Sequence, residues 1–374
     1  MDFSWPDTLD ELRDEVLSFV ETATADLELL DDPWLREPSK QFDRRLGEAG
    51  YIGLRWPVEY GGGGRSALEH FVVMETLLLA GAPVSGAWFP DRQIGPVLLQ
   101  YGTEDQKRRW LPDIIAGRSA WAIGMSEPDA GSNVAGISTK AEIDGDHFVV
   151  NGQKIWTSGA ADADFCYLIC RTSSDGPPHR GLSELVVDMS LPGISVNPIH
   201  DSAWGKHFNE VFFDDVRVPA DCLIGEMNNA FGQTMRQLEH ERGGIDRLVS
   251  NKRLYMDVVG LADTSDPLVR QQIATIETKY TIGRNLVLRN VLGQAPAGHS
   301  AVTKTFCTEF EQEVAQFVSQ VLGARAMLAG AGTLEGRVAR NVVYAPSYTI
   351  MGGTTQILRN IIGERVLGLA REPR

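Results

Sequence analysis

Two short segments carry the residue types from which a redox site could be built. Ser126–Asn133 is a run of small and helix-breaking residues whose backbone amides and hydroxyl groups are left available for hydrogen bonds. Asn151–Ser158 ends an alternating pattern with the indole of Trp156 beside two hydroxyl side chains. Hydrogen-bond donors next to a flat aromatic ring are what a protein needs to hold a flat, redox-active ring. Together the two segments point to a bound flavin.

Length and charge restrict the class of protein. The 374 residues, 43% hydrophobic and 23% charged, fit a globular protein of two or three domains. Lys and Arg number 35 against 50 Asp and Glu, a net charge of −15, so we expect no nucleic-acid partner. No window approaches the roughly 20 apolar residues of a membrane span. The first residues lack the basic start of a signal peptide, so a cytoplasmic location is expected.

The four cysteines include no CxxC pair. Cys166 and Cys170 are four residues apart in an expected strand, so both point to one face. Buried, reduced thiols are the favoured interpretation, and a redox or metal role is the alternative. No metal site is predicted.

The period of the hydrophobic residues divides the chain into three regions. Residues 1–118 have the period of helices, residues 119–224 change to a period of two, and residues 225–374 return to long helices. This order predicts an α+β fold with a central sheet domain. A β-hairpin is expected where residues 140–143 and 147–150 flank Asp144-Gly145-Asp146. Further strands are expected at 165–171, 182–188 and 211–218, and helices at 251–262, 267–292, 301–329 and 355–369.

With these residues in view, the chain resembles the acyl-CoA dehydrogenase family over nearly its whole length. The resemblance is carried by five segments in the family's order and spacing: Tyr60–Gly62, Ser126–Asn133, Asn151–Ser158, Phe212–Pro219 and Gly353–Arg365. It implies an N-terminal α-helical domain, a central β-barrel domain and a C-terminal four-helix bundle. It also implies bound FAD, an acyl-CoA substrate, an electron-transferring flavoprotein as acceptor, and a dimer or tetramer.

The resemblance also assigns roles to residues. Those implied to contact FAD within the chain are Met125, Ser126, Trp156, Thr157, Ser158, Thr354, Thr355 and Gln356. The last three would bind phosphate and ribose at a helix N-terminus, where the dipole favours anions. Gln320 and Gly323 match the segment that reaches the FAD of the neighbouring subunit. The residues implied to contact substrate are Ser132, Arg242, Gly352 and Gly353.

The catalytic base is expected outside its commoner place in the family. Removal of the α-proton of a thioester needs a carboxylate in a dry pocket and donors for the enolate oxygen. The position often used, directly before the Gly-Thr of the last motif, is Gly352 here, which cannot take a proton. The family's other solution, a glutamate on the first long helix of the C-terminal domain, matches Glu241. Glu239 lies about 200° away on that helix, so both cannot face one pocket.

The surroundings of Glu241 support this assignment and leave alternatives open. Gly243 and Gly244 follow it, and each would cost a helix about 1 kcal/mol, which is easier to explain if a ligand closely approaches the backbone. A solvated helix face, Glu239 as base, and the absence of any base in this chain are the alternatives.

A departure from the family concerns the subunit arrangement. Where relatives have an arginine, a Phe-Gly pair and a glutamine that hold the partner's FAD, this chain has Leu261–Gln271 without Phe-Gly. Arg270 and Gln271 could substitute. Equally, a related chain could complete a composite flavin site in a hetero-oligomer.

We therefore expect FAD-dependent conversion of an acyl-CoA thioester to its trans-2-enoyl-CoA. Gly352 removes bulk from the pocket wall, which favours a branched, cyclic or otherwise bulky acyl group. One alternative is a partly or wholly non-catalytic subunit of a hetero-oligomer. Another is an acyl-CoA oxidase, which would pass electrons to oxygen.

Overall fold

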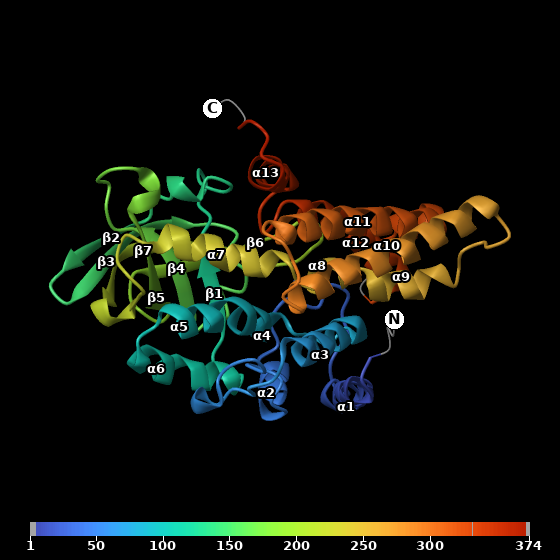
Figure 1. The fold of residues 1–374 in the computed structure, drawn as a ribbon, viewed down its shortest axis with the longest axis horizontal. Coiled ribbons are helices and arrows are strands. Elements are labelled where there is room, and N and C mark those ends of the chain that lie inside the picture. The colour runs from blue at the N-terminus through green and yellow to red at the C-terminus, as the bar shows by residue number, and fades with distance from the viewer. Residues whose placement is uncertain (1–4, 331, 372–374) are drawn as a thin grey trace.

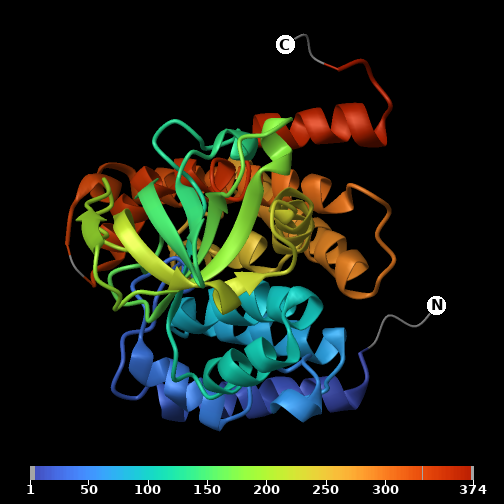
Figure 2. The same ribbon diagram turned by 90° about the vertical axis from the view of Figure 1, so that its left-hand side faces the viewer.

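Helices form both ends of the chain and a single sheet forms its middle (Figure 1). The computed structural model describes residues 5–330 and 332–371, and within residues 236–241 it describes the backbone alone. In Figure 1 the sheet lies to one side, the C-terminal helices to the other, and the N-terminal helices beneath. Figure 2 shows the sheet resting above the N-terminal helices. The α+β class predicted from the sequence is confirmed.

The N-terminal helices pack through apolar stripes with helical spacing. Helix α1 buries Leu9, Leu12 and Val16, and α3 begins with a capping box in which Ser66 and Glu69 satisfy each other's backbone amides. The helices are α1 (Asp7–Ala23), α2 (Lys40–Glu48), α3 (Ala67–Ala80), α4 (Ser85–Phe89), α5 (Gly95–Tyr101) and α6 (Glu104–Ile115). A π-helical segment, η2 (Pro90–Ile94), joins α4 to α5 and forms part of the site described below.

The central sheet has the order β6-β7-β3-β2-β4-β5-β8, with β1 paired in parallel to β4. Its strands are β1 (Trp121–Gly124), β2 (Lys140–Asp144), β3 (His147–Lys154), β4 (Phe165–Arg171), β5 (Leu182–Asp188), β6 (Ile194–Ile199), β7 (Phe208–Pro219) and β8 (Leu223–Ile224). The predicted hairpin is confirmed, since Asp144 pairs with His147 across a turn in which Gly145 has φ +63°. Strands β1 and β3, after which the two motifs follow, belong to the same sheet and are connected through β4 and β2.

The C-terminal region is built around α11, which is buried on most of its surface. The helices of this region are α7 (Ala230–Arg242), α8 (Asp246–Val249), α9 (Lys252–Val259), α10 (Pro267–Val291), α11 (His299–Leu322), α12 (Leu334–Tyr344) and α13 (Thr355–Ile361). Helix α13 stands at the edge of this group, above one end of α11 in Figure 1, and contacts that helix. No helix in the described part of the chain is long and apolar enough to cross a membrane.

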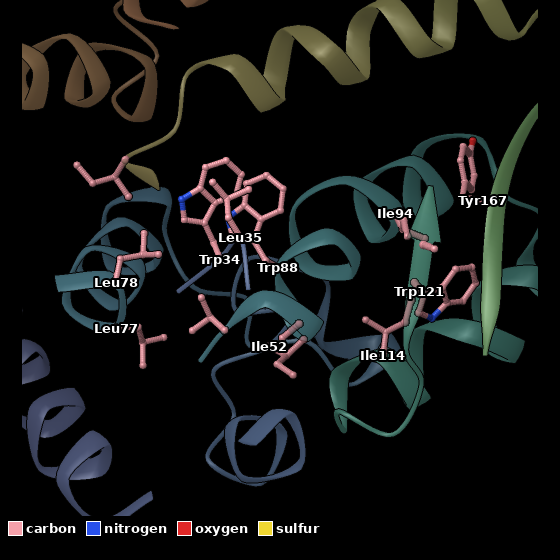
Figure 3. Packing of buried hydrophobic residues seen from close by; sticks show 14 of the residues in the cluster. Trp34, Leu35, Ile52, Leu77, Leu78, Trp88, Ile94, Ile114, Trp121 and Tyr167 are labelled. Atoms are coloured by element: carbon pink, nitrogen blue, oxygen red, sulfur yellow. The ribbon is translucent and has the colours of Figure 1, made fainter. Parts of the chain in front are cut away.

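Aromatic residues join the N-terminal helices to the rest of the core (Figure 3). Trp34 and Trp88 lie with ring centroids 4.8 Å apart, and Trp121 on β1 packs against Phe165 on β4 at the same separation. Such pairs contribute beyond the apolar area that they bury. This aromatic cluster lies where the N-terminal helices pack against the sheet.

The four cysteines are free thiols, all buried. Burial raises the pKa of both Cys166 and Cys170 to about 12, so neither forms a thiolate at neutral pH. The prediction of buried, reduced thiols is confirmed.

Candidate active site

The two motif segments meet where β1 and β3 end. The amide of Ile155 donates to the carbonyl of Ser126 at 2.9 Å, and Nζ of Lys154 donates to the carbonyl of Met125 at 3.0 Å. Trp156 follows with φ +60°, a left-handed conformation that is uncommon for a bulky residue. Its indole is 54% exposed and meets only the edge of the Phe208 ring. Strained backbone and an exposed aromatic ring are features that cluster at functional sites.

Glu127 anchors the first motif to the sheet. Its carboxylate accepts hydrogen bonds from the amides of Ser138 and Thr139, at 2.7 and 2.8 Å, and from Nζ of Lys154 at 2.8 Å. Burial alone would raise the pKa of Glu127, but the charge and hydrogen bond of Lys154 and the hydrogen bonds from residues 138 and 139 lower that pKa to about 2. A permanently ionised carboxylate with these partners has a structural role. Ser132 lies exposed farther along this loop.

Thr157 supplies a buried hydrogen-bonding group. Its backbone is fixed by Asn209, which accepts from the Thr157 amide at 3.0 Å and donates from Nδ2 to the Thr157 carbonyl at 3.0 Å. The hydroxyl of Thr157 is buried without a hydrogen-bond partner among the described residues. Burying an unsatisfied hydroxyl is costly, so such a group marks a place for a ligand. The polar edge of a flavin fits this position, and Ser158 follows it directly.

Two cations hold the glycine pair that precedes α13. Nε of Arg242 donates to the carbonyl of Gly352 at 3.2 Å, and Nζ of the buried Lys304 donates to the carbonyl of Gly353 at 2.9 Å. Both glycines have left-handed backbones, with φ of +66° and +93°. Thr354 then caps α13 by accepting from the amide of residue 357 at 3.2 Å.

The predicted FAD contacts at Thr354, Thr355 and Gln356 therefore lie at a helix N-terminus, as expected. Thr355 is buried, and its hydroxyl lies 3.5 Å from the side-chain oxygen of Gln356. Arg242 of α7 and Lys304 of α11 fix the loop that precedes α13. The start of α13 is therefore held in place by these two helices.

Glu241, the predicted base, is the residue before Arg242 at the end of α7. Its side chain, like that of Glu239, lies outside the described residues. The expectation that Gly243 and Gly244 lie within the helix and weaken it is wrong, because α7 ends at Arg242 and Gly243 is its C-cap. A Cβ on Gly243 would lie 2.5 Å from Asn290 Nδ2, and one on Gly244 would overlap the guanidinium of Arg92. Protein side chains approach this backbone closely.

A cavity of about 810 Å³ opens beside these glycines, between the N-terminal helices and α10–α11. Its walls include both Gly243 and Gly244. Its apolar lining comes chiefly from Phe71, Met74, Leu78, Trp88 and Val287. Ligand pockets commonly have volumes of about 300–1,000 Å³, so this one is large. It lies next to the end of the helix that carries Glu241 and Arg242.

Comparison with known proteins decides the family. Models of the N-terminal, middle and C-terminal domains of acyl-CoA dehydrogenases match residues 6–118, 122–216 and 228–367. The chain belongs to the acyl-CoA dehydrogenase family. Proteins of this family are oxidoreductases that carry FAD.

Relatives of this chain include several proteins from Mycobacterium tuberculosis. The acyl-CoA dehydrogenase IpdE1 of Mycobacterium tuberculosis is 35% identical over 344 residues, covering 90% of this chain and 89% of the relative. A solved structure described as a Tcur3481-Tcur3483 steroid ACAD has a TM-score of 0.91 and 31% identity, and covers all of both chains. The ChsE4-ChsE5 complex from Mycobacterium tuberculosis has a TM-score of 0.87 and 32% identity, again over all of both chains.

Two of the predicted site residues, Gln320 and Gly323, lie far from the others in this chain. Gln320 and Gly323 lie exposed at the end of α11 that is opposite Lys304, roughly 25–30 Å along the helix axis. Arg270 donates from Nη1 to the carbonyls of residues 264 and 265, so in this chain it closes its own turn. A contact of Gln320 or Gly323 with a neighbouring subunit's FAD stays a prediction.

Lys304 was not found by sequence reasoning, although a signal was present. On α11, Ala301, Lys304, Thr308 and Glu311 follow one another at helical spacing on a buried face. A lysine within such a stripe needs a partner inside the protein, since unpaired charge is rarely buried. The structure supplies the carbonyl of Gly353.

Proposed function

We propose that this chain catalyses FAD-dependent α,β-dehydrogenation of a bulky acyl-CoA thioester, giving the trans-2-enoyl-CoA. The observation that carries the proposal is the position of the large cavity. Its wall begins at Gly243, two residues after Glu241, and extends into apolar surface far larger than a short straight chain would fill. Family membership supports the reaction, and the cavity supports the substrate class.

In this proposal the carboxylate of Glu241 takes the α-proton of the thioester. Arg242 and Lys304 hold the loop at Gly352 and Gly353 through its two carbonyl groups. When bound, FAD supplies the acceptor for the hydride that leaves the β-carbon. A loop fixed by two cations costs no reorganisation during the reaction, which is the condition for effective positioning.

The bulky acyl group rests on the absence of a side chain at Gly352 and on the cavity volume. The similar solved structure that is described as a steroid ACAD supports a polycyclic acyl group. The test is anaerobic bleaching of the bound flavin by butyryl-CoA and by 3-(decahydronaphthyl)propanoyl-CoA. We expect the ring-bearing thioester to react with the higher kcat/KM. A much higher value for butyryl-CoA would refute the substrate class, and no bleaching by either would refute the activity.

We propose the electron-transferring flavoprotein as acceptor, because the exposed indole of Trp156 lies at the edge of the predicted flavin site, where a partner can approach. An oxidase would instead release hydrogen peroxide. If turnover with dioxygen alone, measured as hydrogen peroxide released, equalled turnover with the electron-transferring flavoprotein, the oxidase would be favoured.

A second candidate, a subunit that completes a shared flavin site, is favoured by the surface around the far end of α11. There Gln320 and Gly323 lie near Met327 and Leu328, whose side chains are 79% and 56% exposed. Exposed apolar residues beside predicted cofactor contacts fit a covered interface. The FAD content of the chain expressed alone discriminates the candidates. One flavin per chain supports the autonomous enzyme, whereas none, or half on co-expression with a related chain, supports the composite site.

A further inference from the structure

A carboxyl group is buried where the central sheet meets α7, the helix that runs from the sheet toward the C-terminal helices and carries Glu241 (Figure 1). It belongs to Glu184, in the middle of β5, a strand whose residues are buried from Leu182 to Val187. A glutamate is seldom fully buried unless its oxygens have partners. The partners of Glu184 therefore indicate what this group does.

Two of the partners are neighbouring residues of α7. Nε2 of Gln233 donates to Oε2 of Glu184 at 2.6 Å, and Oγ1 of Thr234 donates to Oε1 at 2.8 Å. Consecutive helical residues point about 100° apart, so the two oxygens of one carboxyl group hold α7 from two directions. Because hydrogen bonds weaken steeply when their length or angle changes, this contact fixes both the rotation of α7 about its axis and its position along that axis.

The sheet holds the same carboxyl group from the other side. The hydroxyl of Tyr167 on β4 donates to Oε2 of Glu184 at 2.7 Å. Glu184 pairs across the strands with Ile169, so Tyr167 is its diagonal neighbour on the same face of the sheet. The preceding residue, Ser183, accepts at Oγ from the amide of Asn228 at 2.8 Å, just before α7 begins. Strand β5 thus fixes both the approach to α7 and the beginning of the helix.

The spacing along α7 connects this contact to the proposed base. Glu241 follows Thr234 on the same helix. The interval is about 20° short of two helical turns, so positions 234 and 241 share one face of α7, about 10 Å apart along its axis. A rotation of α7 at Thr234 would therefore turn position 241 by the same angle. At the far end of α7, Arg242 donates to the carbonyl of Gly352, so the helix is fixed at both ends.

Stability alone does not explain this arrangement. Burial raises the pKa of Glu184 from its ordinary value of 4.5, against the three hydrogen bonds, which lower it. Well-packed apolar residues of similar volume commonly replace buried polar groups with no loss of stability, or with a gain. Apolar side chains, however, allow more than one packing, whereas directional hydrogen bonds select a single one.

We propose that Glu184 is a positioning residue for the dehydrogenation, which fixes the rotation and axial position of α7 and thereby directs Glu241 to the α-carbon of the thioester. This inference deepens the proposed function and rests on Glu241 as the base. Glu184 acts through Gln233 and Thr234, from the sheet side of the helix. A displacement of about 1 Å at a reacting group can lower a rate about a hundredfold, so a small rotation of α7 is enough to matter.

The test replaces the whole hydrogen-bonded cluster by apolar residues of similar size, so that no member of the cluster is left without a partner. The variant combines Tyr167→Phe, Glu184→Leu, Gln233→Leu and Thr234→Val. We expect the midpoint of urea unfolding and the FAD content to equal or exceed those of the unaltered protein. We expect kcat for 3-(decahydronaphthyl)propanoyl-CoA to fall at least about tenfold with KM little changed, because the base is misplaced while the binding walls remain. A parallel fall in stability, FAD content and kcat would show a merely structural role, and an unchanged kcat would show no role, so either result would overturn the inference.

Single substitutions keep the test decisive if the combined variant does not fold. Glu184→Gln should retain most of kcat, because its amide oxygen can accept from Gln233 while its amide nitrogen donates to the hydroxyl of Thr234. Thr234→Val removes that hydroxyl, keeps the shape of the side chain, and should lower kcat. Its matched control is Thr76→Val on α3, a buried threonine whose hydroxyl donates to the carbonyl of Val72 in its own helix at 2.7 Å, and it should keep kcat. Equal values of kcat in the two threonine variants would overturn the inference.

The reaction of the unaltered protein separates this inference from the proposed function. If the unaltered, FAD-loaded protein does not bleach its flavin with any thioester, the proposed function is refuted, and this inference with it. If the unaltered protein reacts and Glu241→Gln does not, the base stands. The comparison of the threonine variants then decides the role of Glu184 while the dehydrogenase activity remains established.

Discussion

Arg242 donates from Nε to the carbonyl of Gly352 at 3.2 Å, so a cation holds the position where relatives often carry the catalytic carboxylate. The residue that precedes Arg242 is Glu241, on the same helical turn. The loop at Gly352 and the residue proposed as base are thus linked through one arginine. This arrangement keeps the loop before α13 fixed.

Because Gly353 packs closely against Arg242, adding a methyl group at position 353 should disturb the loop. Gly353→Ala would force a residue with φ +93° to carry a Cβ 3.2 Å from Nη2 of Arg242. We expect a loss of about 1–2 kcal/mol in the free energy of unfolding from backbone strain, and a fall in kcat/KM of at least about tenfold as the loop shifts. Gly176→Ala, at φ +81° with no atom within 4 Å, is the control for strain alone and should keep its activity. Equal activity of both variants would contradict the positioning role.

We expect the carboxylate of Glu127 to be essential for holding the first motif, Ser126–Asn133, in place against the sheet. Glu127→Gln leaves the ammonium of Lys154, which is fully buried, without its ionic partner. Such a loss costs about 3–5 kcal/mol, and we expect urea unfolding at lower concentration together with less FAD per chain. Glu142→Gln, an exposed change on β2, should alter neither quantity. Full FAD content in the Glu127 variant would show that the anchor is dispensable.

Because His207 is buried in its neutral form, we expect the folded protein to lose stability in mild acid. Its backbone carbonyl accepts a hydrogen bond at 2.7 Å from the amide of Gly159, the residue after the predicted flavin contact Ser158. Its Nε2 lies 3.1 Å from the hydroxyl of Tyr344. Burial lowers the pKa of His207 from 6.5 to about 4, opposed by the charges of Asp201 and Glu37 and assisted by residues 340 and 36. The unfolded chain therefore binds a proton at higher pH than the folded chain does.

The stability from a neutral His207 is present above pH 6.5 and declines as the pH falls from 6.5 toward 4. The loss amounts to about 3 kcal/mol at most. Unfolding in urea at several pH values should show this slope, and His207→Gln should flatten it. An unchanged slope in that variant would mean that other groups account for the acid sensitivity.

Much of the fold followed from local patterns in the sequence. The ranges 165–171 and 182–188 match β4 and β5, and the long periodic run from Pro267 matches α10, because alternation and helical spacing act within a few residues. Strand β6 was missed, since Pro198 weakens its pattern, and it pairs only at the sheet edge with β7. Tertiary pairing, not local preference, makes that segment a strand.

The candidate site was predictable only where it is continuous in the sequence. The two motifs were recognised because each is a short segment with its own chemistry. The ion pairs His70–Asp91 and Arg92–Asp246 in the cavity wall were not, since their members meet only after α3, η2 and α8 pack together. The same reason explains why Gly244 was first attributed to a ligand: the guanidinium that lies against it comes from a residue about 150 positions earlier.

The most direct test of the account is reduction of bound flavin by a ring-bearing acyl-CoA in Glu241→Gln. The variant keeps the size and hydrogen-bonding capacity of the side chain but cannot take the α-proton. FAD should remain bound at the level of the unaltered protein, and anaerobic bleaching by 3-(decahydronaphthyl)propanoyl-CoA should nearly cease. Bleaching at an unchanged rate would contradict the assignment of Glu241 as the base, and with it the central claim that this chain carries its own catalytic carboxylate on α7.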